Sequence, residues 1–408
     1  MQVLYPRCAG LDIHKDSVVA RIRCVCEPLH DEVKTFSTTT SALLELNEWL
    51  REHAVTHVAM EATGVYWKPV WHLLEGDFEL VLANAQHIRN VPGRKTDVSD
   101  AAWIADLLAH GLIRSSFVPP VPIQELRDLT RTRKQLVREI SQHTSRIQKI
   151  LEDANLKLGS VLSSVLGKSG RAILEALVAG ETDPEKLADL AVGQARKKRS
   201  ELVEALHGRI RDHHRRLLRV HLELIAALEQ ALADIDAAVG KTLAPIHNSA
   251  RLLTTMPGVS DITAQVIVAE IGVEMVRFPS AAHLISWSGL CPRNDESAGK
   301  RRSTRVRRGA PWLKTTLVSA AWAAVRAKDS YLQAQFHRLR SRRGAKKAIL
   351  AVAASMLTAA YHMLKNNVEY HDLGAEHFTR RDRSKAIQRL VRRLGDLGCH
   401  VQLTPQMA

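Results

Sequence analysis

The sequence predicts a mixed α/β domain followed by an all-α region, an α/β plus all-α chain, and three observations support this prediction. Strand and helix patterns alternate over residues 1–118. Pro119, Pro120 and Pro122 then interrupt the chain, as at a domain boundary. Beyond them, apolar residues recur mainly at helical spacing. We expect an α/β domain at 1–118, a helical coiled-coil region at 119–245, a helical C-terminal domain at 246–370 and a basic tail at 371–408.

Within the first domain, four segments are typical of strands: the apolar runs 3–13, 56–60 and 78–83, and the alternating segment 17–25. Residues 41–53 and 97–110 have the spacing of amphipathic helices, and Asp97 or Ser99 is placed to cap the second of these. Strands and helices in this order predict a sheet covered by helices.

Two long helices are expected in the middle of the chain. Residues 123–158 contain no proline and repeat apolar residues three and four apart, which is the seam of a coiled coil. A second long helical stretch covers residues 196–239, and shorter helices with glycine-rich turns lie between the two. We expect this region to serve oligomerisation or spacing more than chemistry.

The C-terminal domain opens on a pattern typical of a helix-hairpin-helix. Two apolar helical stretches flank the turn Pro257-Gly258-Val259. Such a turn exposes backbone N–H groups that suit a DNA phosphate, and Gly258 is its candidate residue. A plain helical turn accounts for the same residues.

The positive charge of the chain is concentrated in one segment. The 408 residues carry a formal charge of +15, and residues 291–347 contain 16 Lys and Arg against three Asp and Glu. A field this concentrated predicts a polyanionic partner, because each neutralised phosphate releases counterions. A solvated helix face is the alternative interpretation.

Other classes of protein are disfavoured by composition. No run of about 18 uninterrupted apolar residues occurs, and the start of the chain lacks a signal-peptide pattern. We therefore expect a soluble, cytoplasmic protein with no membrane partner. The five cysteines include no C-x-x-C pair, so neither a disulfide framework nor a zinc knuckle is indicated. His213 and His214 are expected on a helix surface, without an acid at metal-ligand spacing.

Four acids stand out by position: Asp12 and Glu61 at strand ends, and Asp97 and Asp100 three residues apart near a helix start. Carboxylates at these places can converge at one edge of a sheet. Two carboxylates about 4 Å apart repel by about 4 kcal/mol at a dielectric of 20, so a cluster of four needs a counterion. Mg²⁺ prefers oxygen ligands and supports in-line phosphoryl displacement. Taken singly, each acid is also compatible with a cap, a surface charge or an ion pair.

Three blocks of the first domain resemble the DEDD insertion-sequence transposases, relatives of the pilin-gene invertase. These blocks are GLDIHK at 10–15, MEATG at 60–64 and RKTDVSDA at 94–101. Four later blocks resemble the C-terminal transposase domain of the same family: MPGV at 256–259, WSGL at 287–290, ESAGK at 296–300 and WLK at 312–314.

The resemblance implies more than composition does. It implies a RuvC-like fold of the RNase H type, with Asp12, Glu61, Asp97 and Asp100 binding Mg²⁺. It also implies that Ser297 attacks a DNA phosphodiester to form a phosphoserine link, although Ala298 stands here where relatives have glycine. The family is guided by a structured bridge RNA that pairs with donor and target DNA. Rejoining strands at two sites further predicts a dimer that assembles to a tetramer.

The expected chemistry is coherent, because a serine needs its proton removed or its developing charge stabilised. Cations near Ser297 can neutralise the transition state, whereas the competing Ser303 lacks the Gly-Lys context. The residues expected to bind nucleic acid are Gly258, Lys300, Arg301, Arg302, Arg305, Arg307, Arg308, Lys314, Arg342, Arg343, Lys346 and Lys347.

Two other functions stay open. A RuvC-like nuclease would hydrolyse DNA junctions with water as the nucleophile, and a catalytically silent protein would only bind nucleic acid. Tyr66 and Trp67 could stack on bases or anchor the segment beneath the sheet.

Overall fold

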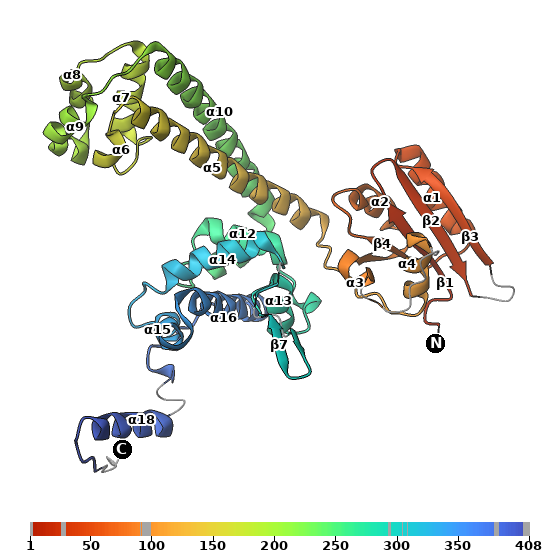
Figure 1. Cartoon of the computed structure of the whole chain (residues 1–408). Helices are drawn as coiled ribbons and strands as arrows, with labels where there is room; N and C mark the ends of the chain where they lie inside the picture. The colour runs from red at the N-terminus through yellow and green to blue at the C-terminus, as the bar shows by residue number, and fades with distance from the viewer. Residues whose placement is uncertain are drawn as a thin grey trace. The chain divides into compact units, whose positions relative to one another are not determined.

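The computed structural model describes residues 3–25, 30–89, 91, 99–292, 295–303, 305–307, 309–378 and 383–402. The chain forms two compact units, Met1–Val118 and Pro119–Ala408. The mixed α/β composition, with one small sheet and a majority of helices, confirms the coarse fold class expected from the sequence (Figure 1).

The first unit is built on a five-stranded sheet of order β3-β2-β1-β4-β5. β2 pairs antiparallel with β1 and β3, whereas β1, β4 and β5 run parallel. The strands are β1 (Arg7–Ile13), β2 (Ser17–Cys24), β3 (His30–Ser37), β4 (His57–Glu61) and β5 (Glu79–Ala83). The helices are α1 (Thr40–Glu52), α2 (Trp67–Leu74), α3 (Ala85–Arg89) and α4 (Asp100–Ala109).

Each face of the sheet has its own apolar core. Ala9, Leu11 and Ile13 of β1 lie in a cluster with residues of α1 and α2. Cys8 of the same strand lies in a second cluster, with Ile104 of α4. The alternation of strand side chains thus sends every second residue of β1 toward α4.

β3 was not expected from the sequence. Val33 and Phe36 are its only large apolar residues, and Val33 is 51% exposed. β3 is an edge strand held by its pairing with β2, and tertiary pairing of this kind overrides a weak local pattern.

The second unit begins with a pair of long helices, α5 (Val121–Asp153) and α10 (Asp212–Leu243), which lie side by side (Figure 1). Their contacts run in opposite directions along the chain, from Arg133–Asp236 to Asp153–His214, so the pair is antiparallel. Between them lie α6 (Leu158–Val161), α7 (Lys168–Ala179), α8 (Pro184–Asp189), η1 (Gly193–Lys198) and α9 (Arg199–Leu206), which share one apolar core with the ends of both helices.

The expected continuous helix over 196–239 is wrong. The chain leaves helical geometry between α9 and α10, where Gly208 meets the carbonyl oxygen of Ala154. A Cβ at Gly208 would lie 2.6 Å from that oxygen, so the close crossing requires glycine. α5 also ends at Asp153, five residues before the expected end.

The described residues of the rest of the unit form helices and, between α13 and α14, a hairpin of β6 (Asp295–Ser297) and β7 (Lys300–Ser303). The remaining elements are η2 (Ala244–Ile246), α11 (His247–Thr254), α12 (Asp261–Ile271), η3 (Met275–Arg277), α13 (Ala281–Ser288), α14 (Pro311–Ala324), α15 (Tyr331–Arg343), α16 (Ala345–Asn366) and α18 (Arg383–Asp396).

α16 is the central helix of this region and contacts α11, α13, α14 and α15. It is the one helix of the described residues that is long and apolar enough to cross a membrane, and 50% of its apolar window is buried inside the protein. The core helix of a water-exposed domain meets the same length and composition criteria.

Candidate active site

Asp12 and Glu61 lie at the same end of two neighbouring parallel strands. Leu11 pairs with Met60, and the next residue of each strand is an acid, Asp12 in β1 and Glu61 in β4. Leu11 and Met60 belong to the core on the α1 side of the sheet, whereas Ala59 lies in the core on the α4 side. Because side chains alternate along a strand, both carboxylates are placed on the α4 side.

α4 brings the third acid to this end of the sheet. The carbonyl oxygen of Ala109, at the C-terminus of α4, accepts hydrogen bonds from the amides of Leu4 and Tyr5, just before β1. Nearer its N-terminus, α4 crosses Gly10 of β1 so closely that a Cβ there would lie 2.3 Å from the oxygen of Ala101. α4 therefore runs antiparallel to β1, and Asp100 comes where β1 ends at Asp12 and Ile13.

The start of α4 differs from the expectation. Ser99 is the N-cap, with its hydroxyl oxygen accepting from the amide of Ala102 at 3.3 Å, and the helix begins at Asp100. Because Ser99 has the extended backbone angles of an N-cap, the helix expected over 97–110 begins three residues later, at Asp100. Asp97 itself lies outside the described residues.

Asp12 and Glu61 each have a polar neighbour. Nε2 of His14 lies 3.3 Å from Oδ2 of Asp12, whose side chain is 23% exposed. The hydroxyl of Thr63 donates to Oε1 of Glu61 at 3.4 Å. Asp12, Glu61 and Asp100 offer the oxygen donors that Mg²⁺ prefers. Among the described residues they are not a group whose ligand atoms all lie within 4.8 Å of one another.

The described group that meets this distance criterion is Asp153, His213 and His214, at the junction of α5 and α10. His214 is 1% exposed, so the expectation that both histidines lie on the surface is wrong for this one. Its Nδ1 accepts from the amide of Arg211 at 3.1 Å, which leaves Nε2 to donate to Oδ2 of Asp153 at 2.9 Å. A metal ion on Nε2 would displace that proton and break the hydrogen bond to Asp153. The His214–Asp153 contact therefore fits a hydrogen bond that joins α5 to α10 better than it fits a metal site.

Ser297 precedes the tight turn of the β6–β7 hairpin. It pairs with Lys300 across a two-residue turn in which Ala298 and Gly299 have φ values of +48° and +72°. Two positive φ values in a two-residue hairpin are typical of a type I′ turn. The side chain of Ser297 lies outside the described residues.

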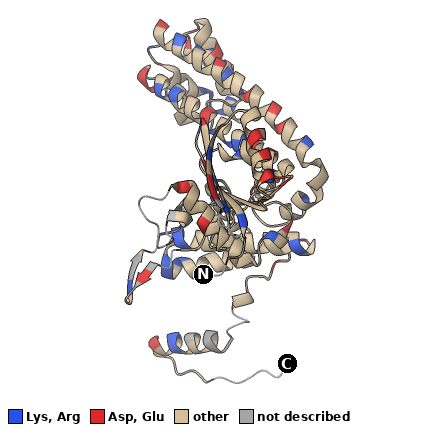
Figure 2. Cartoon of the chain, turned by 90° about the vertical axis from the view of Figure 1, so that its right-hand side faces the viewer, with Lys and Arg blue, Asp and Glu red and all other residues tan. Residues whose placement is uncertain are grey.

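The predicted cations fall into two described groups. Lys300, Arg305 and Arg307 are exposed on the hairpin and the loop that follows it, and Nζ of Lys314 donates to the carbonyl oxygen of Arg307 at 2.8 Å. The second group is exposed at the corner between α15 and α16 and comprises Arg342, Arg343, Lys346 and Lys347. Charges of both signs are mixed along the long helices (Figure 2). The side chains of Arg301 and Arg302, and all of Arg308, lie outside the described residues.

Gly258 has a packing role as well as its predicted phosphate role. With φ at +79°, it lies against α14, and a Cβ there would come within 2.4 Å of the oxygen of Ala320. Ser260 caps α12 through the amide of Thr263, and Asp261 adds a negative charge to that helix start.

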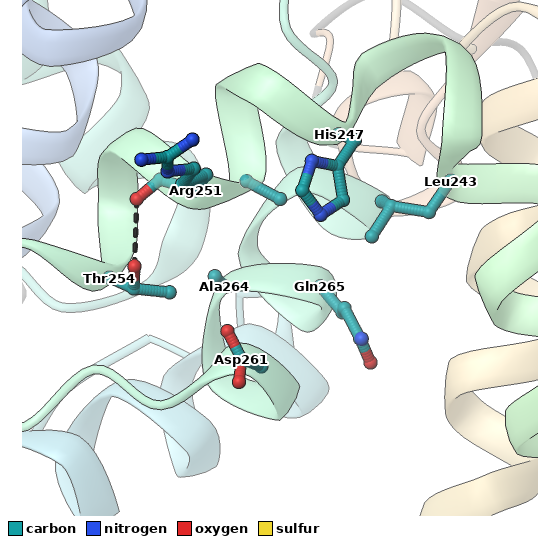
Figure 3. Close-up of a pocket in the computed structure, with 8 residues that line it drawn as sticks. Leu243, His247, Arg251, Thr254, Asp261, Ala264 and Gln265 are labelled. Atoms are coloured by element: carbon teal, nitrogen blue, oxygen red, sulfur yellow. Dashed lines mark hydrogen bonds between the residues drawn. The ribbon is translucent and has the colours of Figure 1, made fainter.

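A cavity of about 250 Å³ lies between α11 and α12 (Figure 3). Its lining residues are Leu243, His247, Ala250, Arg251, Thr254, Asp261, Ala264 and Gln265. None of the predicted site residues lines this cavity, but one of its lining residues, Asp261, follows Gly258 by three residues.

Trp67 and Tyr66 are placed differently from one another. The Trp67 ring packs on the core of the first unit and meets Trp71 edge-on at 5.8 Å, whereas Tyr66 is 41% exposed. The anchoring interpretation therefore holds for Trp67, and Tyr66 is the aromatic residue available for stacking.

Sequence reasoning missed Gly10 as a support of the site. It was noted only as part of the GLDIHK block, although its lack of a Cβ sets the approach of α4 and thus the position of Asp100. It also missed Glu270, which is 1% exposed and binds Arg131 through two hydrogen bonds of 2.8 and 2.9 Å. A carboxylate within an apolar helix was the signal that could have identified Glu270.

Comparison with known proteins matches both ends of the chain. Residues 9–155 match the profile of the IS110-type DEDD transposase domain, described as a transposase, and residues 250–337 match the transposase IS116/IS110/IS902 family. A Streptomyces coelicolor protein, the insertion element IS110 uncharacterized 43.6 kDa protein, is 26% identical over 68% of this chain and 73% of its own length. The transposase for insertion sequence element IS1111A of Coxiella burnetii is 24% identical over 71% of this chain and 72% of its own length.

Proposed function

Because the chain belongs to the DEDD insertion-sequence transposases and is a DNA transposase or recombinase, we propose that it exchanges DNA strands through a Mg²⁺-assisted phosphoserine intermediate. The observation that carries this proposal is the placement of Asp12, Glu61 and Asp100 at one edge and on one face of the sheet. A mixed five-stranded sheet with flanking helices is compatible with the RNase H-like, RuvC-like domain of such enzymes.

The acids would hold Mg²⁺ through carboxylate oxygens, with Asp97 as the fourth member of the set. When bound, the ion stabilises the negative charge that develops on the phosphate oxygens. His14 and Thr63 orient two of the carboxylates through the contacts described above. Gly10 sets the distance of Asp100 from the sheet.

Ser297 would act as the nucleophile. Its hydroxyl oxygen forms a bond to phosphorus, the phosphodiester oxygen of the departing strand leaves, and the serine proton is transferred to that oxygen or to solvent. Lys300 and Arg305 lie on the same hairpin and following loop, where they can stabilise the transition-state charge. Storing the bond energy in the serine ester allows the strand to be rejoined without ATP.

The partners of this reaction would be double-stranded donor and target DNA, a structured bridge RNA and further copies of the chain. The RNA rests on the family resemblance and on the exposed cations of the α15–α16 corner, which suit a phosphate backbone. The dimer-to-tetramer assembly rests on the need to rejoin strands at two sites. We expect the reaction to take place in the bacterial cytoplasm.

The direct test is a covalent adduct. Wild-type protein incubated with labelled donor DNA, guide RNA and Mg²⁺ should give a protein–DNA band that survives denaturing electrophoresis. Ser297→Ala should abolish the band, Ser303→Ala should retain it, and Asp12→Asn should abolish it while DNA binding persists. Cleavage by Ser297→Ala without an adduct would instead favour the water-dependent nuclease.

A matched comparison tests the guide. The same reaction without RNA, or with an RNA whose loops are scrambled, should give no strand exchange at the chosen target. Exchange that is independent of the RNA sequence would contradict guidance but leave the serine chemistry intact.

A further inference from the structure

Trp312, part of the Trp312-Leu313-Lys314 block, lies against three positively charged side chains of α5. The guanidinium carbons of Arg131 and Arg138 lie 5.9 and 5.2 Å from the centre of its ring. Nζ of Lys134 lies 5.8 Å from the same centre. The three side chains share one face of α5, since they are three and four residues apart. An indole ring attracts cations, but it does not cancel their mutual repulsion.

The protein supplies few negative charges here. Both carboxylate oxygens of Glu270 already accept hydrogen bonds from Arg131, and Nε of Arg127 lies 3.9 Å from Oε2 of the same carboxylate. Lys134 donates to neutral groups, the hydroxyls of Thr315 and Thr316 at 2.6 and 3.1 Å and the carbonyl oxygen of Trp312 at 3.5 Å. Arg138 is exposed and has no ion-pair partner among the described residues.

Burial and, next, the positive charge of Arg138 lower the pKa of Lys134. The direction agrees with the geometry, because cations crowd the ring without enough acids to balance them. An anion placed beside Lys134 and Arg138 would relieve this repulsion.

We propose that Lys134 and Arg138, held against Trp312, bind a phosphate of the nucleic-acid backbone. The site rests on the proposed function, because a DNA transposase supplies such a partner. It adds to the predicted cations a surface of α5 that neither composition nor motif had indicated. The charge complementarity favours a phosphodiester backbone, from the DNA duplex or from a structured RNA.

The site continues the surface of the hairpin. Lys134 contacts Thr315 and Thr316 in the first turns of α14. Lys314, also in α14, donates to the carbonyl oxygen of Arg307 in the loop after the hairpin. A backbone that contacts Lys300 and Arg305 on this loop and hairpin can therefore meet α5 at the base of the coiled coil.

The test is the salt dependence of binding by the full chain. Arg138→Gln and the double variant Lys134→Gln/Arg138→Gln are compared with wild type on a DNA duplex and on an RNA hairpin of similar length. Each lost phosphate contact should reduce the slope of log affinity against log salt by about 0.9 on the DNA duplex, and the slope on the RNA hairpin should fall likewise if the RNA backbone occupies the site. A reduced slope on one ligand alone identifies which backbone occupies the site.

Arg219→Gln is the matched control, because Arg219 is an exposed arginine of α10 with no partner among the described residues. Arg138→Gln should keep the melting temperature of wild type while losing affinity for the nucleic acid. Slopes equal to those of the Arg219→Gln variant on both ligands would overturn it, as would a lower melting temperature with unchanged slopes.

The outcome is separable from that of the serine mechanism. A chain that forms no adduct but shows the reduced slope leaves the phosphate site standing. A chain that forms the Ser297 adduct normally, with no change in slope for either variant, contradicts the phosphate site alone.

Discussion

At the scale of single residues, Gly10 connects backbone packing to the candidate site. Any side chain there would meet the backbone of α4 at Ala101 and Ala105, which cannot move as a flexible side chain could. The acids of the site are conspicuous in the sequence because they end strands and begin a helix. The spacing between α4 and β1 could not be predicted from the sequence, because it depends on which helix crosses which strand.

We expect Gly10→Ala to lower the free energy of unfolding by about 1 to 3 kcal/mol, the usual cost of overpacking. Strand cleavage should fall further than stability, because α4 carries Asp100 with it. Gly76→Ala is the control, since a Cβ at Gly76 meets nothing within 4 Å. Urea denaturation and a cleavage assay measure the two effects, and equal behaviour of both variants would contradict the assignment.

Ala298 is the second residue whose backbone bears on function. A φ of +48° costs an alanine about 1 kcal/mol relative to glycine. Ala298→Gly should therefore protect the amides of β6 and β7 from hydrogen exchange, whereas Ala298→Val should increase their exchange and slow adduct formation. Slower exchange in the valine variant would contradict the type I′ turn.

At the scale of elements, the sequence predicted the parallel strands and the helices with a clear apolar period, but it located no individual helix after α12 and missed features set by tertiary contacts. The apolar periods of α1, β4 and β5 were sufficient to place them within one or two residues. β3 was missed because an edge strand needs few apolar residues, and the break at Gly208 was missed because the neighbouring Ala154 backbone causes it. Of the site, the identity of the acids was predictable, whereas the approach of α4 was not.

The coiled coil contains a pair of histidines, His143 and His221, from which we expect a pH dependence of its stability. Nδ1 of His143 lies 3.1 Å from Nδ1 of His221, and burial first, then the charge of His143, lowers the pKa of His221. The unfolded chain therefore binds more protons than the folded one just below the ordinary pKa of 6.5. Stability should fall as the pH drops through this window. Helicity in urea at pH 7.5 and pH 5.5 measures the effect, and His221→Asn should remove most of it.

The junction of α5 with α12 depends on one buried charge. Glu270→Ala would leave Arg131 and Arg127 without their carboxylate, and breaking a buried ion pair in this way costs about 3 to 5 kcal/mol. Equilibrium denaturation should show this loss. Combining Glu270→Leu with Arg131→Leu should be less harmful than Glu270→Ala alone, because only Arg127 is then left without its carboxylate.

At the scale of the whole molecule, the chain divides after Val118 into units that each contain an apolar core. We expect residues 1–118 to fold when expressed alone and to give a cooperative thermal transition, because both faces of its sheet are covered. The isolated unit should form no serine adduct, since Ser297 lies in the other one. A molten fragment would show that the second unit is needed for folding.

The salt-bridged base of α5 has a mechanical consequence. From Arg131 to Asp153 the helix rises about 33 Å at 1.5 Å per residue. A tilt of about 10° at Arg131 would therefore displace the far end of α5 by about 6 Å. A small change in the angle of α5 beside Trp312 would therefore move the α6–α9 cluster by several ångströms, while α5 itself stays helical.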